Sequence, residues 1–177
     1  SDMANWAEAR LIRSQDASGV PPPLFDVGRF GELVTCDPGR AEGARAGRTE
    51  EYFAEDVFLE RPLLEKVAPV WPDGSACAGI VWLERRLLRR LEMELPSGAE
   101  VPGANAVRVE AWDGPTLWQG RWRTLSAPLG VSGQTLALEP DLAGEDGWLR
   151  AGTRKVRWIL PSPDGKDMPF AALKAFS

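Results

Sequence analysis

Histidine is absent from this sequence of 177 residues, and cysteine, tyrosine and long apolar runs are scarce. Without histidine the chain lacks the commonest general base and the commonest metal ligand, which excludes Ser-His-Asp and Cys-His catalysis. Two cysteines also fall short of the four nitrogen or sulfur ligands of a structural zinc site. No apolar run reaches the roughly 18 residues of a transmembrane helix, and no glycine-rich phosphate loop occurs. The sequence therefore predicts a soluble chain without a membrane span or a nucleotide cofactor.

The charge balance is acidic, with 21 Lys and Arg against 26 Asp and Glu, and a net charge of −5. Nucleic-acid binders concentrate basic residues to displace counterions, so we expect no nucleic-acid partner. The arginines within 85–90 are interleaved with leucines and precede Glu92 and Glu94. This pattern indicates a solvated strand face with ion pairs.

Short stretches of alternating polarity, separated by turn residues, dominate residues 67–177. Leu91, Met93 and Leu95 alternate with charged residues, as expected for a strand with one face in the core. Further strands are predicted at 107–112, 117–125, 136–138, 156–160 and 170–176. We expect one all-β domain over 1–177, an antiparallel β-sandwich. Residues 1–66 are less regular, with long loops, a strand at 11–13 and one short helix over 49–58.

The two cysteines, Cys36 and Cys77, stand in surroundings rich in Gly, Pro and Asp that are typical of loops. One alternative is a disulfide, which would stabilise the fold by about 4 kcal/mol in the chain-entropy model. The other is a pair of free, buried thiols.

Carboxylates are the remaining candidates for chemistry. Asp141, Glu145 and Asp146 would supply oxygen ligands for a structural calcium ion, or would simply form a solvated acidic loop. A glycosidase needs two acids across a cleft. The acids available for such a pair are Glu110, Asp113, Glu139, Asp141, Glu145 and Asp146.

Tryptophan is unusually frequent, with eight Trp beside one Tyr. Trp118 and Trp122 share one side of the predicted strand 117–125 and are expected in the core. Trp112 differs, because alternation sends Val107, Val109 and Ala111 inward and leaves the indole with the polar set beside a tight turn. In that position it either stacks on a ligand or packs under a loop. We therefore expect a glycan site at one loop edge, where an exposed indole stacks on a sugar and charged groups bind its hydroxyls. Its predicted residues are Trp71, Arg108, Trp112, Asp113 and Trp148.

Three stretches, 87–95, 107–125 and 153–176, resemble the discoidin or coagulation factor 5/8 C-terminal type of module, within the galactose-binding-like jelly-roll group. The first resembles that family's alternating strand, the second its strand, Asp-Gly turn and Trp-bearing return strand, and the third its last two strands. The resemblance implies a jelly roll whose ligand loops lie at one end. It also implies an extracellular, periplasmic or cell-surface location, because such modules are commonly appended to secreted glycoside-active enzymes and cell-surface proteins.

Three functions remain open at this point. The first is a non-catalytic carbohydrate-binding or substrate-targeting accessory module of a larger secreted or cell-surface bacterial protein, with a glycan as partner. The second is a structural or protein-interaction domain that packs against a neighbouring domain of the same polypeptide through an apolar patch. The third is a carboxylate-based glycoside hydrolase, which needs two acids in a cleft.

Overall fold

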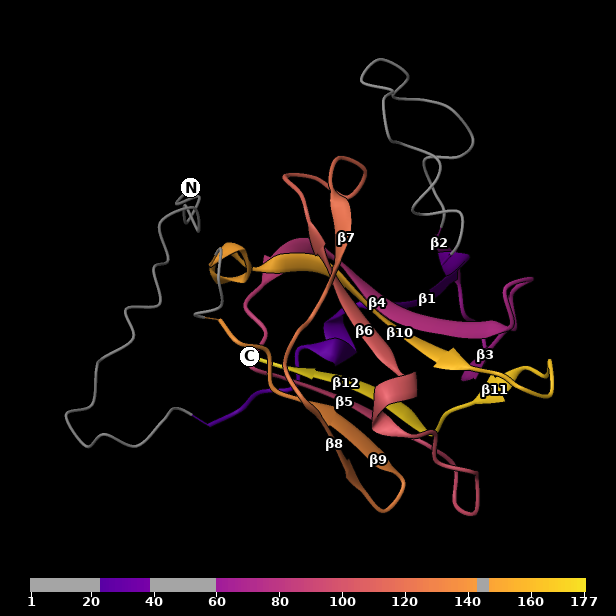
Figure 1. The fold of residues 1–177 in the computed structure, drawn as a ribbon. Helices are drawn as coiled ribbons and strands as arrows, with labels where there is room; N and C mark the ends of the chain where they lie inside the picture. Colours follow the sequence, from indigo (N-terminus) through magenta and orange to yellow (C-terminus); the bar gives the residue numbers. More distant parts are fainter. Residues whose placement is uncertain (1–22, 39–59, 143–146) are drawn as a thin grey trace, which may run out of the picture.

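Antiparallel strands account for most of the regular structure in the computed structural model, which describes residues 23–38, 60–142 and 147–177 (Figure 1). The larger sheet has the strand order β2-β1-β4-β10-β6-β7, and the smaller sheet has the order β12-β5-β9-β8. Every strand pair in both sheets is antiparallel. The predicted all-β sandwich is confirmed.

The six-stranded sheet draws its strands from the whole length of the described chain. Their bounds are β1 Glu32–Cys36, β2 Glu60–Pro62, β4 Ser75–Arg86, β6 Arg108–Asp113, β7 Arg121–Thr124 and β10 Thr153–Pro161. The four-stranded sheet comprises β5 Arg90–Glu94, β8 Leu129–Ser132, β9 Thr135–Leu138 and β12 Ala172–Phe176.

A short ribbon and three single turns of 3-10 helix complete the described structure. The ribbon pairs β3 Val67–Ala68 with β11 Met168–Pro169. The helical turns are η2 Gly28–Phe30, η4 Ala104–Ala106 and η5 Trp148–Ala151. None of the helical segments in the described ranges has the length and apolar character needed to cross a membrane.

The alternation seen in the sequence is reproduced by the smaller sheet. Leu91 and Met93 are buried on β5. The antiparallel pairing of β5 with β9 sets them opposite Leu138 and Leu136. The intervening residues of β5 are only half-buried. The tight connection between β8 and β9 passes through Gly133, whose φ of +57° is a conformation that glycine adopts without strain.

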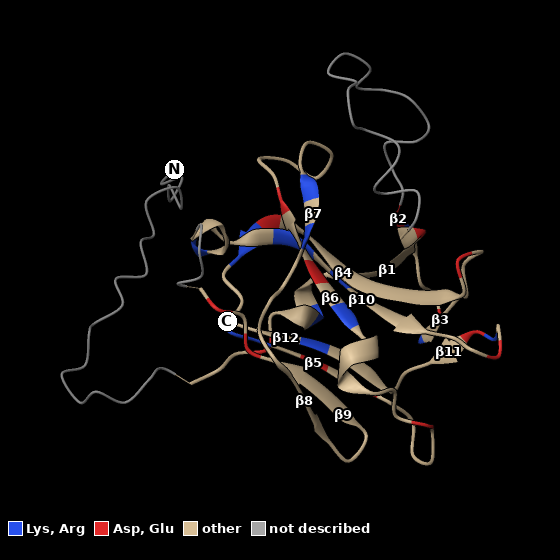
Figure 2. Cartoon of the chain, viewed as in Figure 1, with Lys and Arg blue, Asp and Glu red and all other residues tan. Residues whose placement is uncertain are grey.

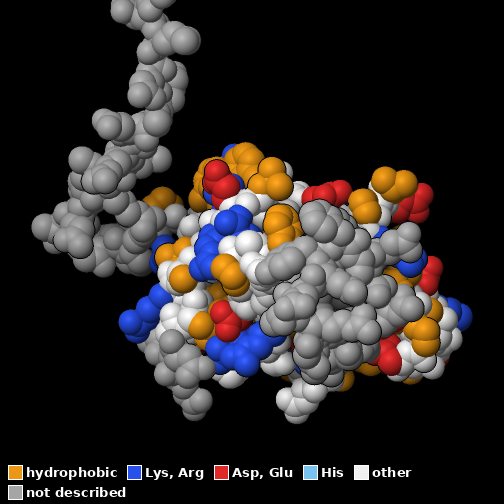
Figure 3. Space-filling model, turned by 90° about the horizontal axis from the view of Figure 1, so that it is seen from above, with side chains coloured by type: hydrophobic (Ala, Val, Ile, Leu, Met, Phe, Trp, Pro, Cys, Tyr) orange, Lys and Arg blue, Asp and Glu red, His pale blue; other side chains and the backbone are white. Residues whose placement is uncertain are grey.

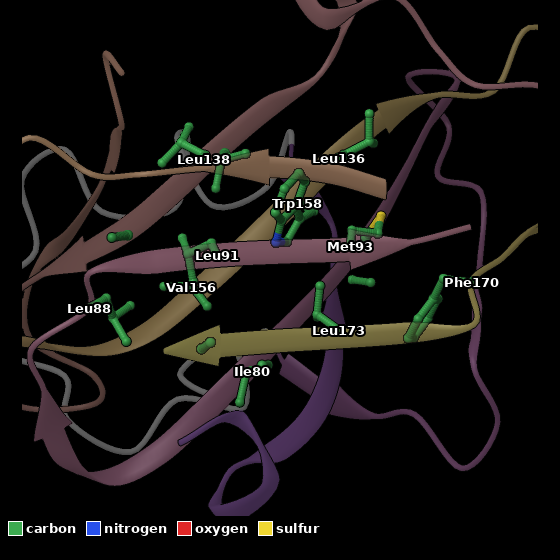
Figure 4. Packing of buried hydrophobic residues seen from close by; sticks show 14 of the residues in the cluster. Ile80, Leu88, Leu91, Met93, Leu136, Leu138, Val156, Trp158, Phe170 and Leu173 are labelled. Atoms are coloured by element: carbon green, nitrogen blue, oxygen red, sulfur yellow. The ribbon is translucent and has the colours of Figure 1, made fainter. Parts of the chain in front are cut away.

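The hydrophobic core lies between the two sheets. Ile80, Val156 and Trp158 of the larger sheet meet residues of the smaller one such as Leu91 and Leu173 (Figure 4). Each of these five side chains is at least nine-tenths buried. Complete burial of one large apolar side chain contributes about 1.5–3 kcal/mol, so this shared layer is what holds the sheets together.

The two central strands of the larger sheet, β4 and β10, are buried on both faces. Residues 76–80 of β4 and 155–160 of β10 are buried without interruption. Only every second residue of these runs belongs to the core between the sheets. The other residues point to the outer face of the six-stranded sheet, the face turned away from the smaller sheet, and that face must therefore also be covered.

Two predicted features differ from the structure, and others lie beyond what it describes. Cys36 and Cys77 lie on strands β1 and β4 instead of in loops. The strand expected over 117–125 is shorter, because residues 114–120 form the connection between β6 and β7. The predicted strand at 11–13, the helix over 49–58 and the acidic residues Glu145 and Asp146 lie outside the described residues.

Candidate functional site

The predicted glycan-site residues divide between the two ends of strand β10. Trp71 and Arg108 lie near its last residues, since the Trp71 N–H donates to the Ser75 carbonyl, and Ser75 and Arg108 are paired with the end of β10. Trp148 belongs to η5, directly before β10 begins. The five predicted residues therefore do not lie on one common surface.

Trp112 is buried, with 7% of its surface exposed, so the expectation of an exposed stacking indole was wrong and the alternative, an indole packed under a loop, is the one observed. Its Nε1–H donates to the Thr116 carbonyl at 2.7 Å. The Trp122 ring packs edge-on against it at 5.4 Å, and the Lys155 Nζ lies 4.5 Å from the centre of the ring. Alternation correctly placed the indole on the outer face, but the β6–β7 connection and these neighbours cover it there.

Trp122 does not lie in the core either. It is directly opposite Trp112 in the β6–β7 pair and shares the outer face with it, where it is half-buried. The expectation that Trp118 and Trp122 belong to the core is therefore corrected for both. Trp118 lies in the β6–β7 connection, where 39% of its surface is exposed.

Asp113 and Trp148 both contact the side chain of Arg123. The Arg123 Nη1 lies 3.3 Å from Asp113 Oδ2, and the same guanidinium lies 4.9 Å from the centre of the Trp148 ring. Arg121, directly opposite Asp113, places its Nε 3.8 Å from the same carboxylate oxygen, and 73% of its side chain is exposed. Figure 3 looks down on the molecule from the β7 side and shows basic side chains beside hydrophobic ones on the surface that grey atoms leave uncovered.

The β6–β7 connection has an internal structure of its own. Its Thr116 carbonyl accepts from Trp112, and the Thr116 hydroxyl accepts from the backbone N–H groups of Trp118 and Gln119 at 3.4 and 2.9 Å. The Arg85 Nη2 donates to the Gly114 carbonyl at 2.8 Å. These bonds fix the path of the loop that carries the exposed indole. The sequence signal for this loop was the pair of breakers, Gly114-Pro115 and Gly120, which bracket it.

A group of buried ion pairs, which sequence reasoning missed, lies on the outer face of the six-stranded sheet. We call Glu60, Glu110, Lys155 and Arg157 the buried ion-pair array. Lys155 Nζ lies 2.5 Å from Glu60 Oε1, and Arg157 Nη2 lies 2.5 Å from Glu110 Oε2. The Arg157 side chain is 1% exposed and the Glu110 side chain 4%.

Two features complete the surroundings of the array. Arg108 binds the other oxygen of Glu110 at 2.8 Å. Figure 2 shows acidic and basic positions following each other along β6. The Trp122 ring covers the Arg157 guanidinium at 4.3 Å. A buried charge that loses its partner is strongly destabilising, so the members of the array depend on one another.

Cys36 and Cys77 adjoin this array as free thiols, so the disulfide alternative is not formed in this structure. Their sulfurs are 3.4 Å apart, and Arg157 Nη1 donates to Cys36 Sγ at 3.3 Å. The hydrogen bond from Cys77, together with the charge of Arg157, holds the pKa of Cys36 below its ordinary value against the opposing effect of burial. The same hydrogen bond and burial raise the pKa of Cys77 well above its ordinary value.

Three of the four described carboxylates proposed for hydrolysis, Glu110, Asp113 and Glu139, are ion-paired with arginines. Glu110 is enclosed by Arg108 and Arg157, and Glu139 is paired with Arg90 at 3.2 Å. Asp141 is exposed. Among the described residues, no three Cys, Asp or Glu side chains are placed to hold a metal ion. The predicted calcium site also requires Glu145 and Asp146, outside the described ranges, so it stays a prediction.

Two open hollows lie on the surface, and the first of them is lined in part by Arg90 and Glu139. One, of about 520 Å³, lies over β8 and β9, and the other, of about 390 Å³, lies between residues 95–103 and 161–169. Neither is lined by an aromatic side chain. They therefore offer no surface on which a sugar ring could stack.

Comparisons with known proteins add no assignment, because no protein-family model and no curated protein matches the chain. What the protein does must therefore be inferred from its fold, from the loop between β6 and β7, and from the buried ion-pair array.

Proposed function

We propose that this β-sandwich is a non-catalytic carbohydrate-binding module that targets a larger secreted or cell-surface polypeptide to a glycan. The observation that carries the proposal is the exposed indole of Trp118, on a loop whose two ends hold Asp113 and Arg121. This surface replaces the predicted one centred on Trp112.

The chemistry of these three side chains suits a shallow sugar site. An indole face stacks on the C–H face of a sugar ring, and Trp118, at 39%, is the most exposed tryptophan among the described residues. A carboxylate accepts hydrogen bonds from hydroxyl groups, while a guanidinium donates them. Asp113 is partly exposed and Arg121 mostly so, which gives both kinds of partner at one end of the sheet.

The resemblance to discoidin-type modules agrees with this location, since ligand loops in that group lie at one end of the sandwich. Trp148 adds a second indole near Asp113, because Arg123 contacts both. Arg108 and Trp71, at the other end of β10, are not part of the proposed surface.

A non-catalytic role is supported by the burial and ion pairing of the carboxylate Glu110. The sequence contains no histidine, so hydrolysis would depend on a pair of carboxylates. Glu110, the acid at the middle of β6, is held between two arginines and is 3% exposed. In that position it does not face a surface that a substrate can reach.

The test begins with a glycan array and continues with titration of the best glycan by calorimetry. Trp118→Ala is expected to weaken binding at least about tenfold, which corresponds to about 1.4 kcal/mol. Phe30→Ala is the matched control, because Phe30 is an exposed aromatic residue, at 57%, on η2. Equal affinity of Trp118→Ala and the unmodified protein would contradict the proposed surface.

The protein-interaction alternative has one observation in its favour. Leu83 is 85% exposed, and Phe25 and Phe30, which stack at 6.0 Å, are each more than half exposed. Such side chains are typical of surfaces that pack against another domain. A domain that binds no array glycan, but binds a hydrophobic dye less after Leu83→Ser, would favour this alternative.

A further inference from the structure

The two cysteines face each other across adjacent strands. The β1–β4 register sets Leu33 opposite Ile80 and Val34 opposite Gly79. Two further steps along each strand bring Cys36 opposite Cys77, which explains the separation of 3.4 Å between their sulfurs. Directly opposite residues are neighbours in every folded molecule, so this contact is a property of the register and not of a loop conformation.

The sulfur pair has a cation on one side and apolar cover on the other. The Arg157 guanidinium, which is always protonated, donates to Cys36 Sγ through Nη1 and to Glu110 through Nε. Ile159 and the half-buried Trp71 pack against the two cysteines. The cation therefore lies beside Cys36, whereas Cys77 is fully buried behind it.

We propose that Cys36 and Cys77 form a redox-active dithiol, in which a small hydroperoxide oxidises Cys36 and Cys77 then closes an intramolecular disulfide. This inference is independent of glycan binding, since Trp118 lies at the opposite end of β10. It assigns different roles to two residues that are chemically identical in the sequence.

The reaction balances with hydrogen peroxide as the oxidant. The Cys36 thiolate attacks one peroxide oxygen, the O–O bond breaks, and the other oxygen leaves as hydroxide, which becomes water on taking a proton. Cys36 is then a sulfenic acid. The Cys77 sulfur attacks Cys36 Sγ, the S–O bond breaks, and the departing hydroxide takes the Cys77 proton. In total, two thiols and one peroxide give one disulfide and two waters.

Burial selects the oxidant. Cys36 is 2% exposed and Cys77 is fully buried, so a bulky disulfide reagent cannot reach either sulfur without opening the sheet face. Hydrogen peroxide is close to water in size. The final bond then requires the sulfurs to approach from 3.4 Å to roughly 2.05 Å, a movement small enough for side-chain rotation and a slight adjustment of the two strands.

The order of the two cysteines follows from their different surroundings. A thiolate is the reactive form of cysteine, and a nearby cation favours it. Arg157 and the hydrogen bond from Cys77 lower the pKa of Cys36, whereas the pKa of Cys77 is raised. Arg157 acts here as a positioning residue, because it does not itself exchange atoms with the peroxide.

The experiment treats the reduced chain of 177 residues with one equivalent of hydrogen peroxide. The expected product has lost the mass of two hydrogen atoms and, after denaturation, has no thiols that react with an aromatic disulfide reagent. Cys77→Ser is expected to stop at the sulfenic acid, which adds the mass of one oxygen atom and which dimedone captures on Cys36 when the treated protein is denatured in its presence. Cys36→Ser is the matched control and is expected to give at most a tenth of that dimedone adduct.

Two results would overturn the proposal. The first is a native protein that keeps both thiols under conditions that oxidise the thiols of the denatured chain. The second is equal dimedone labelling of the two serine variants. If either variant fails to fold, peptide mapping of the unmodified protein, treated with peroxide and then denatured in the presence of dimedone, replaces it. An adduct that falls mainly on Cys77 would contradict the assigned order.

Discussion

Trp112 and Trp118 are six positions apart and have opposite environments, with 7% and 39% of their surfaces exposed. Alternation along β6 indicates the face to which Trp112 points, but it does not indicate whether that face is covered. The covering groups, Trp122 and Lys155, come from two other strands. The prediction for Trp112 failed for this reason, and the same information was missing for Trp118.

The two tryptophans should therefore differ in their contribution to stability. Trp112→Ala removes a buried indole and its hydrogen bond to Thr116, and we expect it to lower the free energy of unfolding by about 3–5 kcal/mol. Trp118→Ala should change it by no more than about 0.5 kcal/mol. Chemical denaturation followed by circular dichroism measures both. Similar losses in the two variants would show that the loop indole is also structural.

Core residues on the face between the sheets were the most predictable from sequence. Leu91, Met93 and Leu136 alternate with polar neighbours, and each is at most 1% exposed. Lys155 and Arg157 were not predictable in this way, because alternation alone would place them in solvent. Their burial depends on Glu60 and Glu110, which reach them only through the long-range register of the sheet.

At the level of elements, a glycine of β4 lies directly against the backbone of β10. A Cβ atom on Gly79 would lie 2.4 Å from the Val156 carbonyl oxygen and 3.3 Å from Arg157 Cβ. The first contact is with backbone, which cannot move without disturbing the ladder. This position therefore requires glycine on steric grounds, beneath the buried ion-pair array.

Gly79→Ala is expected to destabilise the fold by about 1–3 kcal/mol, the usual cost of forcing extra atoms into a packed interior. Gly130→Ala on β8 is the matched strand control, since its nearest neighbour would lie at an ordinary 3.6 Å. We expect that change to stay within about 0.5 kcal/mol. Thermal unfolding of both variants tests the contrast, and a harmless Gly79→Ala would mean that the two strands can separate at low cost.

Strands whose polarity alternates along the sequence were found most readily. The strands at 107–112, 136–138, 156–160 and 170–176 were predicted close to their observed positions. The full extent of β4 was not, because residues 76–80 are all buried and carry no two-residue periodicity. The return strand β7 begins later than predicted. The prediction began the strand at Leu117, but Leu117 and Trp118 belong to the connection that precedes β7.

At the scale of the whole molecule, one hydrophobic cluster joins both sheets. Its members include Trp82 and Val109 of the larger sheet and Leu138 and Ala175 of the smaller one. We expect one cooperative unfolding transition, with coincident curves from tryptophan fluorescence and circular dichroism. Two separated transitions would contradict the single domain predicted over residues 1–177.

The class of fold was predictable from sequence, but the composition of the sheets was not. Strand β10 lies between β4 and β6, so Val156 is paired with both Ile80 and Ala111. Such pairings join segments far apart along the chain, and local polarity patterns carry no information about them. The sequence left open whether Cys36 and Cys77 form a disulfide or stay free thiols for the same reason, since their contact depends on the register of β1 and β4.

The backbone hydrogen bonds between Phe25 and Ser177 have a consequence for chain connectivity. Phe25 N–H donates to the Ser177 carbonyl at 3.1 Å, and Ser177 N–H donates to the Phe25 carbonyl at 3.0 Å. A short linker could therefore join these two positions without disturbing either sheet. New ends could then be opened at the exposed Ser132-Gly133 turn, which makes the sandwich suited to circular permutation. Its strand pairings, and not the order of the strands along the chain, would then define the fold.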